Sequence, residues 1–133
     1  MTPETLARLA AARAHRDLSD LARQGVGGIG CAAGARERIE AARRLRVTVT
    51  GLLDLVVLGG EPWEGIARAL CRRDVETVRA EYAEAVPYWQ VAPATVLREA
   101  AGEARDLDAW YRRHREDIDP PVENPVFDLL VRG

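Results

Sequence analysis

The glycine-rich stretch GVGGIG, residues 25–30, has the spacing that binds the pyrophosphate of a dinucleotide. In that use, the stretch joins a strand to a following helix, and the glycines let the backbone approach the phosphates. The residues before it repeat their apolar positions in steps typical of an amphipathic helix: Leu6, Leu9, Ala10, Ala14, Leu18, Leu21 and Ala22. We therefore interpret the glycines as a connector between two helices, and we expect no nucleotide site and no cofactor.

Other residues that could do chemistry lack the partners that they would need. His114 lies near Asp108 and two aromatic residues, but no nucleophile or oxyanion donor can be assigned beside it. We interpret this segment, Asp108 included, as a solvated helix face. Cys31 and Cys71 have no zinc-ligand spacing with each other or with either histidine. We expect no metal site and no catalytic residue, and we predict that the protein is not an enzyme.

The composition favours a single helical domain. The chain has 133 residues, 47% of them hydrophobic, and is rich in Ala, Leu, Arg and Glu. All 19 basic residues are arginine, and the formal net charge of −2 gives no overall basic field. The N-terminal segment lacks the apolar core of a signal peptide, and no apolar run is long enough to span a membrane. We expect a cytoplasmic protein without membrane contact.

The pattern of elements predicts an all-α bundle of about five helices with an extended C-terminal arm. Thr2 and Pro3 are typical of a helix start, and Gly25 is typical of a helix end. The predicted segments are an amphipathic helix over 1–24, a glycine-rich linker over 25–34, a central unit over 35–92, a helix over 93–118, and a proline-rich arm with an apolar end over 119–133.

The central unit begins with a segment that can be interpreted in two ways. A helical spacing favours a helix to about Leu58, with an apolar face at Ile39, Ala42, Leu45 or Arg46, Val49, Leu53 and Val56. The run from Leu45 to Thr50 is instead β-branched and alternating, and Gly51 would weaken a helix by about 1 kcal/mol. A strand over 45–50 is the alternative.

Two short helices with a tight break follow, which is the pattern of a helix-turn-helix. The predicted first helix is Trp63–Leu70, and the second is Val75–Val86 with Asp74 as its N-cap. Small and apolar residues at the right positions would hold the two helices together. These are Trp63, Ile66, Ala67, Leu70 and Val78.

The run LVVLGGEPWEGIARALCRRDVETVRAEY resembles the helix-turn-helix of actinobacterial DNA-binding regulators and, more distantly, the promoter-reading region of sigma factors. The resemblance covers about residues 35–86. It implies that the protein is a transcriptional regulator whose second helix lies in the major groove of double-stranded DNA. Cys71 occupies the turn position that usually holds glycine, which is a departure from the pattern because a non-glycine residue disfavours positive φ. The break is also one residue longer than usual.

The resemblance assigns DNA contacts to the start of the second helix. Arg72 or Arg73 would bind a guanine edge, and Glu76 would accept from a cytosine amino group. Thr77 would contact a phosphate or a thymine methyl. The predicted DNA-binding residues are Arg72, Arg73, Glu76, Thr77 and Arg79 on this helix, with Arg36, Arg43 and Arg44 on backbone phosphates.

The charge balance of the helix pair predicts a homodimer. From Glu61 to Val86 there are four arginines and six acids, so one copy would hold DNA weakly. The N-terminal helix and the apolar segment Val126–Val131 offer spare surface for a second copy or for another protein. Docking of that segment within its own chain or on a second chain stays open. The alternative function is a helical protein-interaction adaptor that binds no DNA.

Overall fold

The protein is all-helical, as the composition predicts. The computed structural model describes residues 2–29, 34–60, 62–82 and 94–132. The helices of the described residues are α1 (Pro3–Gly28), α2 (Ala35–Val57), α3 (Trp63–Ala69), α4 (Val75–Tyr82), α6 (Ala94–His114) and α7 (Phe127–Arg132). The predicted continuation of α4 to Val86 lies outside the described residues.

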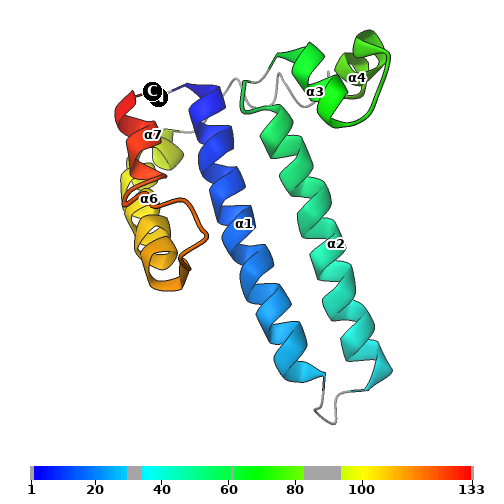
Figure 1. Ribbon diagram of the computed structural model, residues 1–133, viewed down its shortest axis with the longest axis vertical. Coiled ribbons are helices and arrows are strands. Elements are labelled where there is room, and N and C mark those ends of the chain that lie inside the picture. Colours follow the sequence, from blue (N-terminus) through cyan, green and yellow to red (C-terminus); the bar gives the residue numbers. More distant parts are fainter. Residues whose placement is uncertain (1, 30–33, 61, 83–93, 133) are drawn as a thin grey trace.

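The helices form three layers with α1 in the middle. α2 runs antiparallel to α1 and packs on one side of it, and α6 and α7 pack on the other side of α1, as Figure 1 shows. α3 and α4 pack on each other at the C-terminal end of α2, away from the loop that joins α1 to α2. The molecule is therefore a long helical hairpin with a small helix pair at one end and a third layer along α1.

α1 is longer than the sequence predicts. Its start is as expected, because the Thr2 hydroxyl accepts a hydrogen bond from the Thr5 amide at 3.1 Å. The prediction of a C-cap at Gly25 is wrong, since the helix continues to Gly28. Gly60 is the one described glycine with positive φ, so the α1 glycines are helical. Each helical glycine costs about 1 kcal/mol relative to alanine, and the helix forms through all three of them: Gly25, Gly27 and Gly28. The linker is correspondingly shorter.

α2 is one unbroken helix, so the alternative of a strand over 45–50 is wrong. The two threonines of this run turn their hydroxyls back onto the helix. Thr48 Oγ1 donates to the carbonyl of Arg44 at 2.8 Å, and Thr50 Oγ1 donates to that of Arg46 at 3.0 Å. A strand needs a neighbouring strand to satisfy its backbone, and the described residues contain none. The helix supplies these bonds within itself.

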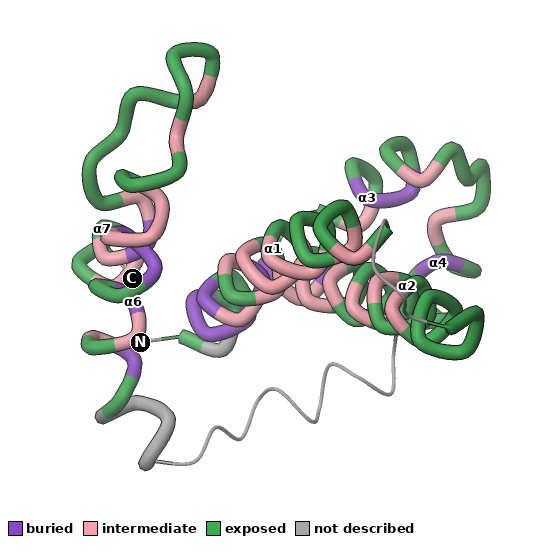
Figure 2. Tube along the Cα trace, turned by 90° about the horizontal axis from the view of Figure 1, so that it is seen from below, coloured by how far each residue is buried: buried purple, intermediate pink, exposed green. Residues whose placement is uncertain are grey.

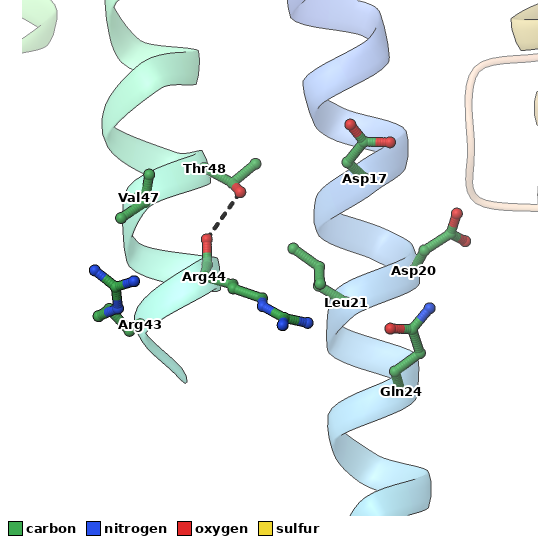
Figure 3. Close-up of a pocket in the computed structure, with 8 residues that line it drawn as sticks. All are labelled: Asp17, Asp20, Leu21, Gln24, Arg43, Arg44, Val47 and Thr48. Carbon is green, nitrogen blue, oxygen red and sulfur yellow. Dashed lines mark hydrogen bonds between the residues drawn. The ribbon is translucent and has the colours of Figure 1, made fainter. Parts of the chain in front are cut away.

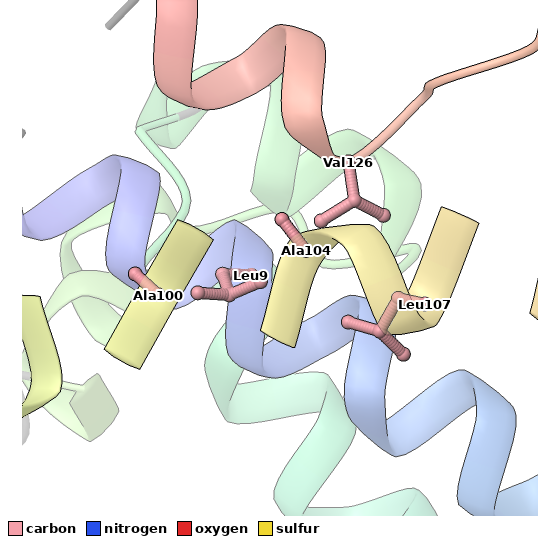
Figure 4. Packing of buried hydrophobic residues seen from close by; sticks show 5 residues of the cluster. All are labelled: Leu9, Ala100, Ala104, Leu107 and Val126. Carbon is pink, nitrogen blue, oxygen red and sulfur yellow. The ribbon is translucent and has the colours of Figure 1, made fainter. Parts of the chain in front are cut away.

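The first apolar core lies between α1, α6 and α7. Its buried residues are Leu9, Ala100, Ala104, Leu107 and Val126 (Figure 4). The two alanines carry small side chains on the buried face of α6, which lets that helix approach α1 closely. An ion pair between Arg13 and Glu103 joins the same two helices at the edge of this core. The third layer is thus fixed to α1 by both apolar and charged contacts.

The C-terminal segment folds back on its own chain, and the prediction of an extended arm is wrong. α6 ends at His114 and not at 118, because the Glu116 amide donates to the Asp119 carboxylate at 2.8 Å and leaves the helical pattern. The Tyr111 hydroxyl then donates to the Pro120 carbonyl at 2.5 Å. Arg112 donates to the Glu123 carbonyl at 2.7 Å. These bonds return the chain to α6, so docking of Val126–Val131 within the chain is the arrangement observed.

Asp108 anchors the returning chain. Its side chain is 1% exposed, and its two oxygens accept hydrogen bonds from the amides of Val126 at 2.8 Å and Phe127 at 3.0 Å. These amides lie at the N-terminus of α7, where backbone donors have no partner within the helix. The interpretation of Asp108 as a solvated residue is therefore wrong. A carboxylate is tolerated inside this core because it caps a helix.

Replacing Asp108 with alanine should lower the free energy of unfolding by about 2–4 kcal/mol, because two amides of α7 lose their acceptor in a buried setting. Asp108→Asn keeps one oxygen acceptor and should lose less. The exposed neighbour Asp106→Ala is the matched control, with an expected change within about 0.5 kcal/mol. Urea denaturation followed by circular dichroism measures all three. Equal stability of Asp108→Ala and Asp106→Ala would contradict this role.

Candidate nucleic-acid interface

The second apolar core holds α3 and α4 to the end of α2. Val57, Ile66, Ala67 and Val78 are buried together, and Val78 is 0% exposed. Four partly buried residues pack around them: Trp63, Leu70, Val75 and Tyr82. All five residues that the sequence predicts to hold this helix pair together belong to this cluster. Ala67 contributes only a methyl group, as expected where two helices cross closely.

The turn between α3 and α4 is a Schellman motif. The Cys71 amide donates to the Arg68 carbonyl at 3.1 Å, and the Arg72 amide donates to the Ala67 carbonyl at 2.8 Å. Cys71 has a φ of 57°, in the left-handed region where glycine is usual. Cys71 adopts this conformation although a non-glycine residue disfavours it. The chain thus makes a glycine-type turn with a side chain present.

Asp74 starts α4 as its N-cap, as predicted. Its carboxylate accepts from the Glu76 amide at 3.0 Å and from the Thr77 hydroxyl at 2.6 Å. The hydrogen bonds from Thr77, led by the hydroxyl, lower the pKa of Asp74 below its ordinary value. The ionised Asp74 carboxylate therefore stabilises the folded state fully at a pH above the pKa that Asp74 has in the unfolded chain. This stabilisation is lost as the pH falls through the lower pKa that Asp74 has in the folded chain.

The five predicted contact residues of the helix pair gather on one exposed surface around the start of α4. Most of them are engaged within the chain. Arg72 forms a two-pronged pair with Glu81, at 2.6 and 3.3 Å, and Thr77 is held by Asp74. Arg79 lies 3.6 Å from the Glu76 carboxylate, and its guanidinium lies 6.0 Å from the centre of the Trp63 ring.

Arg73 differs from these residues. Its side chain is exposed, and among the described residues it has no hydrogen bond or ion pair. An arginine held by no carboxylate can bind a base or a phosphate without first breaking a bond. The geometry therefore ranks Arg73 first among the predicted contacts, where the sequence placed Arg72 and Arg73 together.

The three predicted phosphate-binding arginines lie in the first half of α2, whereas the α3–α4 pair packs at the C-terminal end of that helix. Arg36 is about 30 Å from the end of α2 at Val57, at about 1.5 Å per helical residue. Arg36 pairs with Glu40 at 3.7 Å. Arg44 points toward α1 and Arg43 points away from it (Figure 3). One chain therefore does not bring these arginines beside α4.

Arg43 and Arg44 line an open groove of about 480 Å³ between α1 and α2. Acids from α1 share its walls. The lining residues are Asp17, Asp20, Leu21, Gln24, Arg43, Arg44, Val47 and Thr48. Two carboxylates beside two arginines reduce the positive potential that a phosphate would meet. This groove is thus a weaker phosphate site than the count of arginines in α2 suggests.

Sequence reasoning missed two residues that shape the interface. Glu81 holds Arg72, and the Trp63 ring lies beneath Arg79. Both contacts join residues across the turn, and neither has a spacing that identifies it in a sequence. The short separation of Asp74 and Thr77, by contrast, is a local signal, and the N-cap was predictable from it.

Other classes of site find no support in the described part of the chain. No cluster of three or more histidine, cysteine, aspartate or glutamate side chains with metal-binding geometry occurs among the described residues. None of the described helices combines the length and apolar character that crossing a membrane requires. Comparison with protein-family models, with curated proteins and with solved structures gives no match. The function is therefore inferred from the geometry of this chain.

Replacing Cys71 with glycine should raise the free energy of unfolding by about 0.5–1 kcal/mol. Relief of a left-handed conformation is worth about 1–2 kcal/mol, and the greater freedom of unfolded glycine offsets part of it. Cys71→Ala is the matched control, because it also removes the thiol but keeps a Cβ at positive φ. Thermal unfolding of both variants is the measurement. If the glycine variant is no more stable than the alanine variant, the turn is not strained.

Proposed function

We propose that the protein binds double-stranded DNA through the α3–α4 helix pair and acts as a transcriptional regulator. The observation that carries the proposal is the way α4 is held. Val75, Val78 and Tyr82 use one side of the helix for the core, while the surface that follows Asp74 stays exposed. A rigid turn and an exposed second helix are what a helix-turn-helix needs to enter a major groove.

Arg73 is the first candidate for direct base contact. A two-pronged bond from an arginine to guanine discriminates against other bases by about 1–3 kcal/mol. Glu81 keeps the Arg72 guanidinium in one position on the same surface, and the Trp63 ring does the same for Arg79. Arg72 must break its two bonds to Glu81 before its guanidinium can bind a base in the same way, which leaves Arg73 as the first candidate.

The charge of this surface limits what one copy can achieve. Between residues 72 and 81, three arginines stand against three acids. Phosphate neutralisation supplies most of the non-specific affinity for DNA, so a surface without net positive charge binds weakly by itself. The proposed regulator therefore works as a homodimer, in which binding of one helix pair raises the effective concentration of the other at the DNA, so that their binding free energies combine.

A protein-interaction adaptor is the second candidate, and a specific observation favours it. α2 exposes a row of apolar residues along its length, including Ile39, Val49 and Leu53. Exposed apolar patches on a folded chain mark interaction surfaces. Binding through such a row would change little with salt, whereas DNA affinity falls steeply as salt rises. Salt dependence therefore separates the two functions.

Selection from random duplex DNA, followed by fluorescence anisotropy at low and physiological salt, should give a recurrent site. Arg73→Ala should then weaken binding by about 1–3 kcal/mol at one base position and relax the preference there. Arg113→Ala, an exposed arginine on α6, is the matched control and should bind like the unchanged protein. Failure to enrich any sequence, together with no binding at low salt, would overturn the proposal. An Arg73→Ala variant with an unchanged site would remove Arg73 from the reading surface.

A further inference from the structure

α2 carries an apolar row that the described chain leaves uncovered. The members have large exposed fractions, at 67% for Ile39, 52% for Val49, 42% for Leu53 and 46% for Val56. With Ala42 and Arg46 they follow alternating steps of three and four residues: Ile39, Ala42, Arg46, Val49, Leu53 and Val56. This is the spacing of the a and d positions of a coiled coil. We call these six residues the α2 seam.

The α2 seam is distinct from the row that packs on α1. The half-buried residues of α2 that precede its buried end are Ala41, Leu45, Thr48, Leu52 and Leu55. They also follow steps of four and three, and they form the stripe against which α1 packs. α2 is thus apolar on two sides. The prediction of a single apolar face that contains Leu45 together with Ile39 and Leu53 is wrong, because Leu45 lies on the side that packs on α1. One side has a partner helix in this chain and the other has none among the described residues.

The packing of α1 on α2 leaves the apolar residues between the two helices only partly buried. Leu45, Leu52 and Leu55 remain only half-buried although they face α1, because two helices alone cannot seal a seam. Figure 2 shows α2 mostly exposed or half-buried, whereas buried residues gather in α1, α6 and the α3–α4 pair. A further pair of helices against the α2 seam would complete a four-helix bundle.

We infer that the α2 seam binds the α2 seam of a second copy of this chain, with the two helices antiparallel. The distribution of charge along α2 favours a second copy of α2 as the partner and an antiparallel arrangement of the two helices. Residues 36–46 contain five arginines and two glutamates, whereas residues 47–57 contain Asp54 and no base. A parallel pair would place Arg46 against Arg46 and one arginine-rich half against the other. An antiparallel pair sets each arginine-rich half against the half that carries Asp54.

The positions of the apolar residues in the seam, and a groove beside Val56, also favour the antiparallel arrangement. Reversing one α2 against the other pairs Ile39 with Val56 of the second copy, and Ala42 with Leu53 of the second copy. A groove of about 300 Å³ lies at the Val56 end of the seam. Its walls are Arg8, Ala11, Ala12, His15, Leu55, Val56 and Gly59. A branched aliphatic side chain such as Ile39 of the second copy fits this mainly aliphatic groove, and the small Ala42 meets the larger Leu53.

The antiparallel pair also bears on DNA binding, a consequence that rests on the proposed function. The two α3–α4 pairs would lie at opposite ends of the paired helices, about 30 Å apart at about 1.5 Å per residue. Half-sites on adjacent turns of B-DNA are about 34–36 Å apart. Arg36 and Arg43 of one copy would then lie near the α3–α4 pair of the other. The phosphate-binding arginines that one chain holds far from α4 are thus supplied by its partner.

The oligomeric state tests the seam without any DNA. Light scattering behind size exclusion should give about twice the 14.6 kDa mass of the chain at micromolar concentration. Leu53→Lys with Val56→Lys should raise the dimer dissociation constant at least ~100-fold, because a base then replaces the apolar side chains that face Ala42 and Ile39 in the arginine-rich half of the second copy. Both residues are exposed in the single chain, so the helical circular dichroism should not change. The control is Ile118→Lys, which alters an exposed apolar residue elsewhere and should stay dimeric.

The direction of the pair is tested by cysteine cross-linking. The background carries Cys31→Ser and Cys71→Ser, and separate chains then carry Ile39→Cys or Val56→Cys. An antiparallel seam predicts a disulfide-linked dimer in the mixture of the two chains and little in either chain alone. A cross-link in the Ile39→Cys chain alone overturns the antiparallel arrangement. A monomeric protein, or a dimer that survives Leu53→Lys with Val56→Lys, overturns the seam itself.

These outcomes separate the seam from the proposed function. A dimer that cross-links as predicted but enriches no DNA sequence supports the seam and overturns DNA binding. A monomer that still selects a sequence through Arg73 supports DNA binding and overturns the seam.

Discussion

The two-sided burial of α1 is the constraint on which the rest of the structure depends. Ala7 and Leu9 are both almost fully buried. They lie on different sides of the helix, because two residues span about 200° of turn. One side packs on α2 and the other on α6 and α7, so α1 packs against both other layers of the described chain. α1 thereby fixes α2, and α2 carries the α3–α4 pair.

Local features of this fold were predictable from the sequence. The Thr2 and Asp74 caps depend on residues within a few positions of each other. The helical character of each long segment follows from apolar spacing in the same way. Length was less predictable, since α1 continues through Gly25, Gly27 and Gly28, where glycine indicated a helix end.

Long-range features were not predictable. Asp108 resembles any charged residue on an amphipathic helix, yet it is buried by a segment 18 positions further along the chain. The two apolar rows of α2 could not be separated by spacing alone, because rows of alternating three- and four-residue steps run side by side on one helix. Which row is covered depends on where α1 lies. The candidate site divides in the same way. Five predicted residues lie around the start of α4, and the other three, Arg36, Arg43 and Arg44, lie in the first half of α2.

The two apolar cores of the described chain share no residue. One joins α6 and α7 to α1, and the other joins α3 and α4 to the end of α2. A substitution on the exposed surface of α4 therefore changes no residue of either core directly. Evolution could alter the surface residues of the helix pair without disturbing the scaffold that carries them. Chains with the same three layers but different recognition surfaces would then be readily accessible by mutation.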